Sequence, residues 1–207
     1  MERLLNNELL GYLNNKRQVG VAPIIGPLNV RIEEIEDIAV FDVVDTRHKG
    51  LPVVRAFGEG HATYFNDSHT FKLKIIQYED FLNALGDVSK HIKRPDLMLY
   101  TSELKSYFII HEISIGSSRN KRKDGKHQLG NTIQLLNRIP AIKQYLSTFT
   151  NRLCILSGAD GAVVTPNGIA DAFSEIYHQI ADPEPLNCAF CQKGGFDAFI
   201  THNIVLR

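Results

Sequence analysis

The chain has 207 residues, 43% hydrophobic and 22% charged, which suits one globular domain with a substantial core. Its 23 basic and 23 acidic residues cancel, which excludes a globally basic protein that binds nucleic acid by net charge alone. No apolar run approaches the ~20 residues of a membrane span, and the N-terminus lacks the composition of a signal peptide. Three cysteines are too few for a disulfide framework. We therefore expect a cytoplasmic protein with reduced thiols and no membrane partner.

The first part of the chain is expected to form two helices with strands between them. Leucines at three- and four-residue spacing predict a helix over residues 2–15. Segments rich in β-branched and aromatic residues between 19 and 69 predict strands or irregular arms. Within them, Gly58-Glu59-Gly60-His61 is interpreted as a tight turn, because it lacks the spacing of a nucleotide-binding loop. Apolar spacing predicts the second helix over residues 78–91, ending before Pro95.

A hairpin predicted over residues 97–115 carries two acidic residues of interest. Its polar turn at 101–106 centres the pairing near residue 104, so Asp96 and Glu112 should be cross-strand partners about 5 Å apart. Glu112 lies in the apolar segment FIIHEISI, where a carboxylate is costly unless it is paired or binds a metal. Two such carboxylates suit a hard divalent ion, which polarises a phosphodiester and makes bound water nucleophilic.

Less specific interpretations of these residues are also open. An aspartate after a proline is ordinary turn chemistry, and Glu112 could instead form a salt bridge with Arg94 or Lys126. His111 faces away from Glu112 along the strand, so we expect a packed or surface imidazole and not a catalytic base.

The second half of the chain completes an α/β pattern. Residues 116–125 are interpreted as a long charged loop, and apolar spacing from 126 to about 149 predicts a helix that Pro140 kinks or breaks. The remaining predicted elements are a buried strand at 152–159, a helix at 168–181 and one final strand at 196–206. The expected fold is a single domain with a mixed central β-sheet flanked by helices.

Positive charge is concentrated just after the hairpin. The five cations are Arg119, Lys121, Arg122, Lys123 and Lys126, against the single acid Asp124. They precede a helix N-terminus, where backbone N–H groups already favour a phosphate, so they could position a nucleic-acid backbone without reading its sequence. A solvated surface run is the equally weighted alternative.

The hairpin and the helix after it resemble the PD-(D/E)xK nucleases, a family that includes many restriction enzymes. The resemblance extends from about Lys93 to Ser157 and consists of Pro95-Asp96, the hairpin, Glu112-Ile113-Ser114 and the start of the next helix. It implies a restriction-endonuclease-like fold and a Mg²⁺ site, with Mn²⁺ as a substitute, formed by Asp96, Glu112 and the Ile113 carbonyl.

The family places a lysine two residues after the glutamate, where this chain has Ser114. Because serine cannot supply a positive charge, Lys123 or Lys126 would have to replace that lysine. Gln128 is similar to a glutamine that several family members carry on the next helix. The upstream helix of the family sometimes adds another acidic ligand, for which Glu8 and Glu79 are the candidates.

The resemblance implies a metal-dependent endonuclease that cleaves double-stranded DNA, most similar to a type II restriction enzyme working as a homodimer. Residues 78–181 would form the core, and 19–75 and 182–207 would serve recognition or dimerisation. The first alternative is a non-catalytic nucleic-acid-binding module on the same fold, with Ser114 marking lost activity.

The second alternative is a Zn²⁺-stabilised interaction domain. Cys188 and Cys191 have half the ligand spacing of a zinc knuckle. His202 could be a third ligand, and His178 or Cys154 a fourth.

Overall fold

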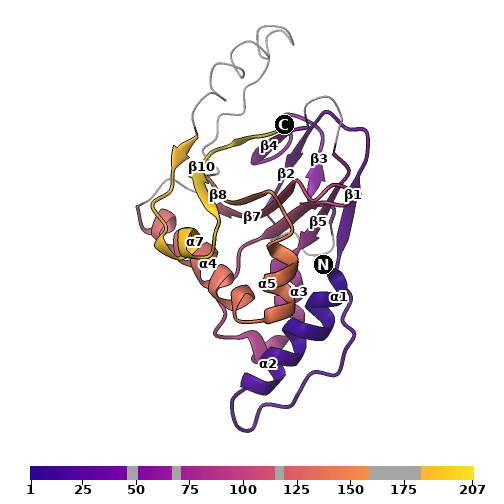
Figure 1. Cartoon of the computed structure of the whole chain (residues 1–207), viewed down its shortest axis with the longest axis vertical. Coiled ribbons are helices and arrows are strands. Elements are labelled where there is room, and N and C mark those ends of the chain that lie inside the picture. The colour runs from indigo at the N-terminus through magenta and orange to yellow at the C-terminus, as the bar shows by residue number, and fades with distance from the viewer. Residues whose placement is uncertain (46–50, 67–70, 115–118, 159–182) are drawn as a thin grey trace, which may run out of the picture.

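Two β-sheets pack face to face, and helices cover the other face of the larger sheet (Figure 1). The structure, a computed structural model, describes residues 1–45, 51–66, 71–114, 119–158 and 183–207. The larger sheet has the order β1 (Ile32–Ile35), β5 (Leu73–Gln77), β6 (Leu97–Thr101), β7 (Tyr107–Ser114), β8 (Asn151–Gly158), β10 (Asp197–Ile200) and β9 (Glu184–Pro185). The smaller sheet has the order β11 (Asn203–Leu206), β4 (Ala62–Asn66), β2 (Val40–Val43) and β3 (Val54–Arg55). The mixed α/β class with helices flanking a large mixed sheet is confirmed.

The described helices include those predicted over 2–15, 78–91 and 126–149, and one, Ala189–Lys193, that was not predicted. They are α1 (Glu2–Leu4), a π-helical turn (Leu5–Leu9), α2 (Leu10–Lys16), α3 (Tyr78–Ala84), a 3₁₀ turn (Gly86–Ser89), α4 (Arg119–Asn137), α5 (Pro140–Leu146) and α7 (Ala189–Lys193). The N-terminal helix is confirmed, and Pro140 separates α4 from α5 at the first position of the new helix. None of the helices in the described segments is long and apolar enough to cross a membrane.

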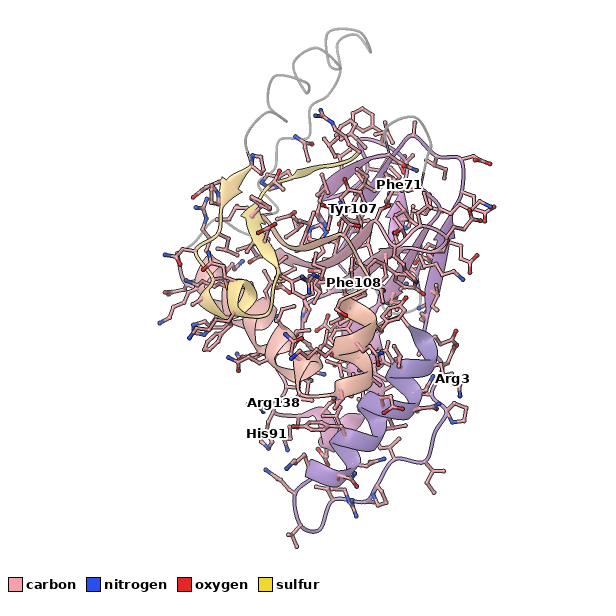
Figure 2. The ribbon with its side chains drawn as sticks, viewed as in Figure 1. Arg3, Phe71, His91, Tyr107, Phe108 and Arg138 are labelled. Atoms are coloured by element: carbon pink, nitrogen blue, oxygen red, sulfur yellow. The ribbon has the colours of Figure 1, made fainter. Side chains whose placement is uncertain are left out.

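The larger sheet separates two hydrophobic cores. Successive residues of a strand face opposite sides, so Phe108 enters the core under the helices and Tyr107 enters the core between the sheets. Figure 2 labels both residues, together with Phe71, whose ring meets Tyr107 edge-on with centroids 5.3 Å apart. Phe108 meets Phe149 at 5.3 Å on the helix side. The sheet is therefore buried on both faces around β7.

The predicted hairpin has the expected register. Leu97 pairs with His111 and Tyr100 with Phe108 in an antiparallel ladder. The same register, continued by one residue, places Asp96 opposite Glu112. On its other edge, β7 pairs with the parallel strand β8, and Glu112 lies beside Leu156.

The prediction of a charged loop over residues 116–125 is wrong from Arg119 onward, because α4 begins there. Lysine and arginine are good helix formers, and Gly125, at the end of the predicted loop, has a packing role in the helix. A Cβ on Gly125 would lie 2.6 Å from Leu156 Cδ1 and 3.2 Å from Glu112 Cγ. Gly125 thus allows α4 to approach β7 and β8 closely.

This packing gives a testable difference between two helical glycines. Gly125→Ala should lower the free energy of unfolding by about 1–2 kcal/mol, because the added methyl group displaces Leu156. Gly11→Ala on α2 is the matched control, since its Cβ would meet no atom within 4 Å, and should raise stability by about 0.5–1 kcal/mol. Urea denaturation measures both. Equal stabilisation by the two substitutions would contradict the close approach.

Three other predictions differ from the structure or lie outside it. The helix expected over 78–91 ends at Ala84, and Gly86 has a φ of 53° that interrupts it. The single strand expected over 196–206 is two strands, because the chain crosses at Thr201 from β10, parallel to β8, to β11, parallel to β4. The helix expected over 168–181 lies outside the described residues.

The segments assigned to recognition or dimerisation also build the fold. Residues 19–75 supply β1 to β4 and the start of β5, and the described part of 182–207 supplies β9 to β11. Whether they also contact DNA or a second copy stays a prediction.

Candidate functional site

Three carboxylates from distant parts of the chain meet at the start of β6. One ligand oxygen from each of Asp45, Glu79 and Asp96 lies within 4.8 Å of the others, close enough to share one cation. Asp45 and Asp96 are 3% and 6% exposed, and Glu79 is half-buried. Among the described residues, this is the one group of at least three acidic, histidine or cysteine side chains whose ligand atoms all lie this close together. Oxygen ligands of this type suit Mg²⁺ or Mn²⁺.

Backbone hydrogen bonds attach Glu79 to Asp96. Helix α3 follows β5 without a loop, and the Asp96 carbonyl accepts the N–H groups of Tyr78 at 2.9 Å and Glu79 at 3.2 Å. These N–H groups are in the first turn of α3, where a helix leaves its donors unsatisfied. The Asp96 carbonyl, directly before β6, thus caps α3. This capping places the Glu79 side chain beside the Asp96 side chain.

Asp45 reaches the cluster from the smaller sheet. It follows β2, and its N–H donates to His61 Nδ1 at 3.2 Å, while the His61 N–H donates to the Val43 carbonyl at 2.9 Å. His61 ends the predicted tight turn, which is confirmed: Gly58 has a φ of 87° and the Glu59 N–H donates to Ala56 at 3.1 Å. The turn therefore positions a carboxylate, although it carries no nucleotide-binding motif.

Burial and like charge both act on Asp96. Desolvation is the largest cause that raises the pKa of its carboxyl well above the usual value, and the charges of Asp45 and Glu79 raise it further. The Ile113 N–H donates to Asp96 Oδ2 at 2.7 Å and opposes this shift. Asp45 also shares a side-chain hydrogen bond with Asp96, which requires a proton between them. A divalent cation would replace that proton and remove the repulsion.

Of the three predicted site residues on β7, Ile113 forms a backbone hydrogen bond with the Asp96 carboxylate. The donor is the Ile113 N–H, whereas the prediction used the Ile113 carbonyl. Glu112 is 7% exposed and does not belong to the group of three carboxylates. It lies under α4 at Gly125, opposite Asp96 in the hairpin register. Ser114 ends β7, half-buried and beside Gly158.

Gln128 and the basic residues lie on α4. Gln128 Nε2 donates to the Arg94 carbonyl at 2.8 Å, so this side chain holds the backbone two residues before Asp96. Arg94 Nη1 donates to Asn83 Oδ1 at 2.7 Å. Lys121, Arg122 and Lys123 are exposed in the first turns of α4, and Lys126 is half-buried. Arg119 begins the helix.

His111 is a packed imidazole, as the sequence indicated. Ser157 donates its hydroxyl proton to the Thr201 carbonyl at 2.6 Å, so His111 Nε2 must donate to Ser157 Oγ at 2.7 Å. Nδ1 then accepts from the Tyr64 hydroxyl at 2.9 Å. Burial, with a smaller effect of His202, lowers the pKa of His111 to about 3. This neutral group links the two sheets and takes no part in the acidic cluster.

The proposed zinc ligands are not assembled into a group of three among the described residues. Cys188 and Cys191 do lie together, with their sulfur atoms 2.9 Å apart. His202 is near Gly158, where its Cε1 would lie 3.6 Å from an added Cβ. His178 lies outside the described residues.

The sequence identified two members of this cluster, Asp96 and Glu79, the latter as one of two candidates for a further ligand. The other candidate, Glu8, is exposed on the N-terminal helical stretch. Asp45 was missed. The available signal was an aspartate directly after the buried strand segment VFDVV, but nothing in the sequence showed that this strand ends beside the hairpin.

No protein-family model, curated protein or solved structure matches the chain.

Proposed function

We propose that this chain is a Mg²⁺-dependent endonuclease that hydrolyses double-stranded DNA, with Asp45, Glu79 and Asp96 holding the ion. The observation that carries the proposal is their convergence from three elements at the start of the hairpin strand β6. Asp96 is the aspartate of the PD-(D/E)xK-like motif, and Glu79 lies on the helix just upstream. A bound ion would polarise the phosphodiester and activate water.

The remaining residues have separate proposed roles. Glu112 is the second acid of the hairpin pair, and Gln128 supports the chain that leads into Asp96. The exposed cations of α4 would contact the DNA backbone. Lys123 or Lys126 would supply the positive charge that Ser114 lacks. A two-fold homodimer would present one such site to each strand of a duplex.

The direct test is incubation of the purified chain with supercoiled plasmid in Mg²⁺, Mn²⁺ or EDTA. We expect nicked or linear product with either ion and none with EDTA. Retained DNA binding without cleavage in both ions would contradict the nuclease and support the alternative of a binding module, for which Ser114 is the motivating residue.

The contact of α4 with DNA predicts a change in salt dependence. Arg122→Ala combined with Lys123→Ala should reduce the slope of log affinity against log salt by about 2, because each phosphate contact contributes about 0.9. Lys16→Ala with Lys143→Ala removes two cations from α2 and the exposed face of α5 and is the matched control. Fluorescence anisotropy across a salt series measures the slopes. The same reduction in both double variants would show non-specific charge binding.

A further inference from the structure

Two thiols outside the acidic cluster lie almost within bonding distance. Cys188 precedes α7 and Cys191 lies within it, and their Sγ atoms are 2.9 Å apart. This separation is about 0.9 Å longer than an S–S bond. Both residues are buried, at 1% and 0% exposure. Because the sulfur atoms are already this close, forming the bond requires only a small adjustment of the segment from Cys188 to Cys191.

We propose that Cys188 and Cys191 form a reversible dithiol–disulfide couple, a modification site separate from the proposed nuclease centre. Its oxidant would be a small-molecule disulfide of the glutathione class. One thiolate attacks the reagent and releases one thiol, forming a mixed disulfide. The second cysteine thiolate then attacks the protein sulfur, forms the Cys188–Cys191 bond and releases the second thiol. The protein loses two electrons and two protons, which the reagent gains as two thiols.

The surroundings favour this pair over a bond to Cys154. Cys154 also hydrogen-bonds Cys191, but it belongs to β8, which is held between β7 and β10. Cys188 instead lies at the end of a five-residue helix. Hydrogen bonding with Cys191 and burial raise the pKa of Cys188, and hydrogen bonding with Cys154 raises that of Cys191. Both thiols are protonated at neutral pH, so reaction with the reagent should be slow.

The pair also lies directly on α4. Cys188 Sγ is 3.9 Å from the Lys126 carbonyl and 3.4 Å from where a Cβ on Gly130 would lie. The bond would form inside this existing contact, so the oxidised chain should keep its fold.

The test uses the full chain treated with oxidised glutathione under native conditions, followed by denaturation, alkylation and intact-mass analysis. We expect one alkylated cysteine, a mass consistent with one internal disulfide, unchanged circular dichroism and full reversal by dithiothreitol. Cys154→Ala should form the disulfide equally well. Cys188→Ala, which keeps Cys154 and Cys191, should form an internal disulfide at least ~10-fold more slowly.

Three results would overturn the proposal. The first is equally fast internal oxidation of Cys188→Ala. The second is retention of all three thiols in the native chain when the denatured chain oxidises. The third is stoichiometric zinc in the purified chain that blocks oxidation until a chelator removes it, which would assign these thiols to a metal.

Discussion

Replacing Asp96 with alanine is expected to reduce Mg²⁺-dependent plasmid cleavage by at least ~10³-fold, because one of the three carboxylates that would bind the ion is lost. The assay is plasmid nicking at saturating Mg²⁺. Asp87→Asn is the matched control, since Asp87 is an exposed acid that pairs with Lys90 on the 3₁₀ turn. Equal activity of the two variants would remove Asp96 from the site.

Stability separates a metal-binding acid from a structural one. Asp96→Asn keeps an oxygen that can accept the Ile113 N–H but removes the carboxyl whose ionisation burial, Asp45 and Glu79 all oppose. Without metal, this variant should unfold at a higher temperature than the unmodified chain at neutral pH. The unmodified chain should gain about 1.4 kcal/mol when Mg²⁺ is tenfold above its Kd, and the variant should gain nothing. Destabilisation of the variant without metal would indicate a structural role.

The direction of the Asp96 pKa shift gives this effect a pH dependence. A carboxyl whose folded pKa is raised contributes stability below its unfolded pKa, near 3.8, and loses it as pH rises through the folded value. The stabilisation by Mg²⁺ should therefore grow as pH rises. Thermal unfolding with and without Mg²⁺ between pH 5 and 8 measures it.

The second large effect is expected from His111 in acid. Its folded pKa of about 3 lies below the unfolded value of 6.5, so the unfolded chain binds the extra proton first. The stability contributed by the neutral imidazole is complete above pH 6.5 and falls by about 1.4 kcal/mol for each pH unit below it. His111→Gln should remove this slope between pH 6 and 4 while lowering stability at neutral pH.

Tyr64→Phe is the matched control for that slope. It deletes the hydroxyl that donates to His111 Nδ1 but leaves the imidazole buried, and burial is the largest cause of the shift. This variant should lose stability at neutral pH and keep the acid slope. Urea denaturation across the pH range compares the three chains. A slope retained in His111→Gln would assign the acid sensitivity to other groups.

Local patterns in the sequence were sufficient for the hairpin and its acids. The polar turn and the apolar runs on either side specify the register, and the register places Asp96 opposite Glu112. The buried strand β8 and the break at Pro140 follow from equally local signals. In each case the residues that determine the structure lie within one hairpin, strand or turn of the chain.

What the sequence did not reveal depends on long-range packing. Asp45 joins Asp96 only because the smaller sheet covers the larger one, through contacts such as Tyr64 with His111. The packing role of Gly125 was not apparent because its close neighbour, Leu156, is far along the chain. The crossing at Thr201 was missed because β10 and β11 share one apolar pattern and differ only in their partners.

The crossing at Thr201 also bears on how the chain is synthesised. β10 covers one edge of β8, and three residues later β11 covers one edge of β4, so residues 197–206 add a strand to both sheets. Until these residues leave the ribosome, β8 and β4 present open backbone edges that can pair with other chains. The nascent protein therefore depends on this one segment to cover both edges.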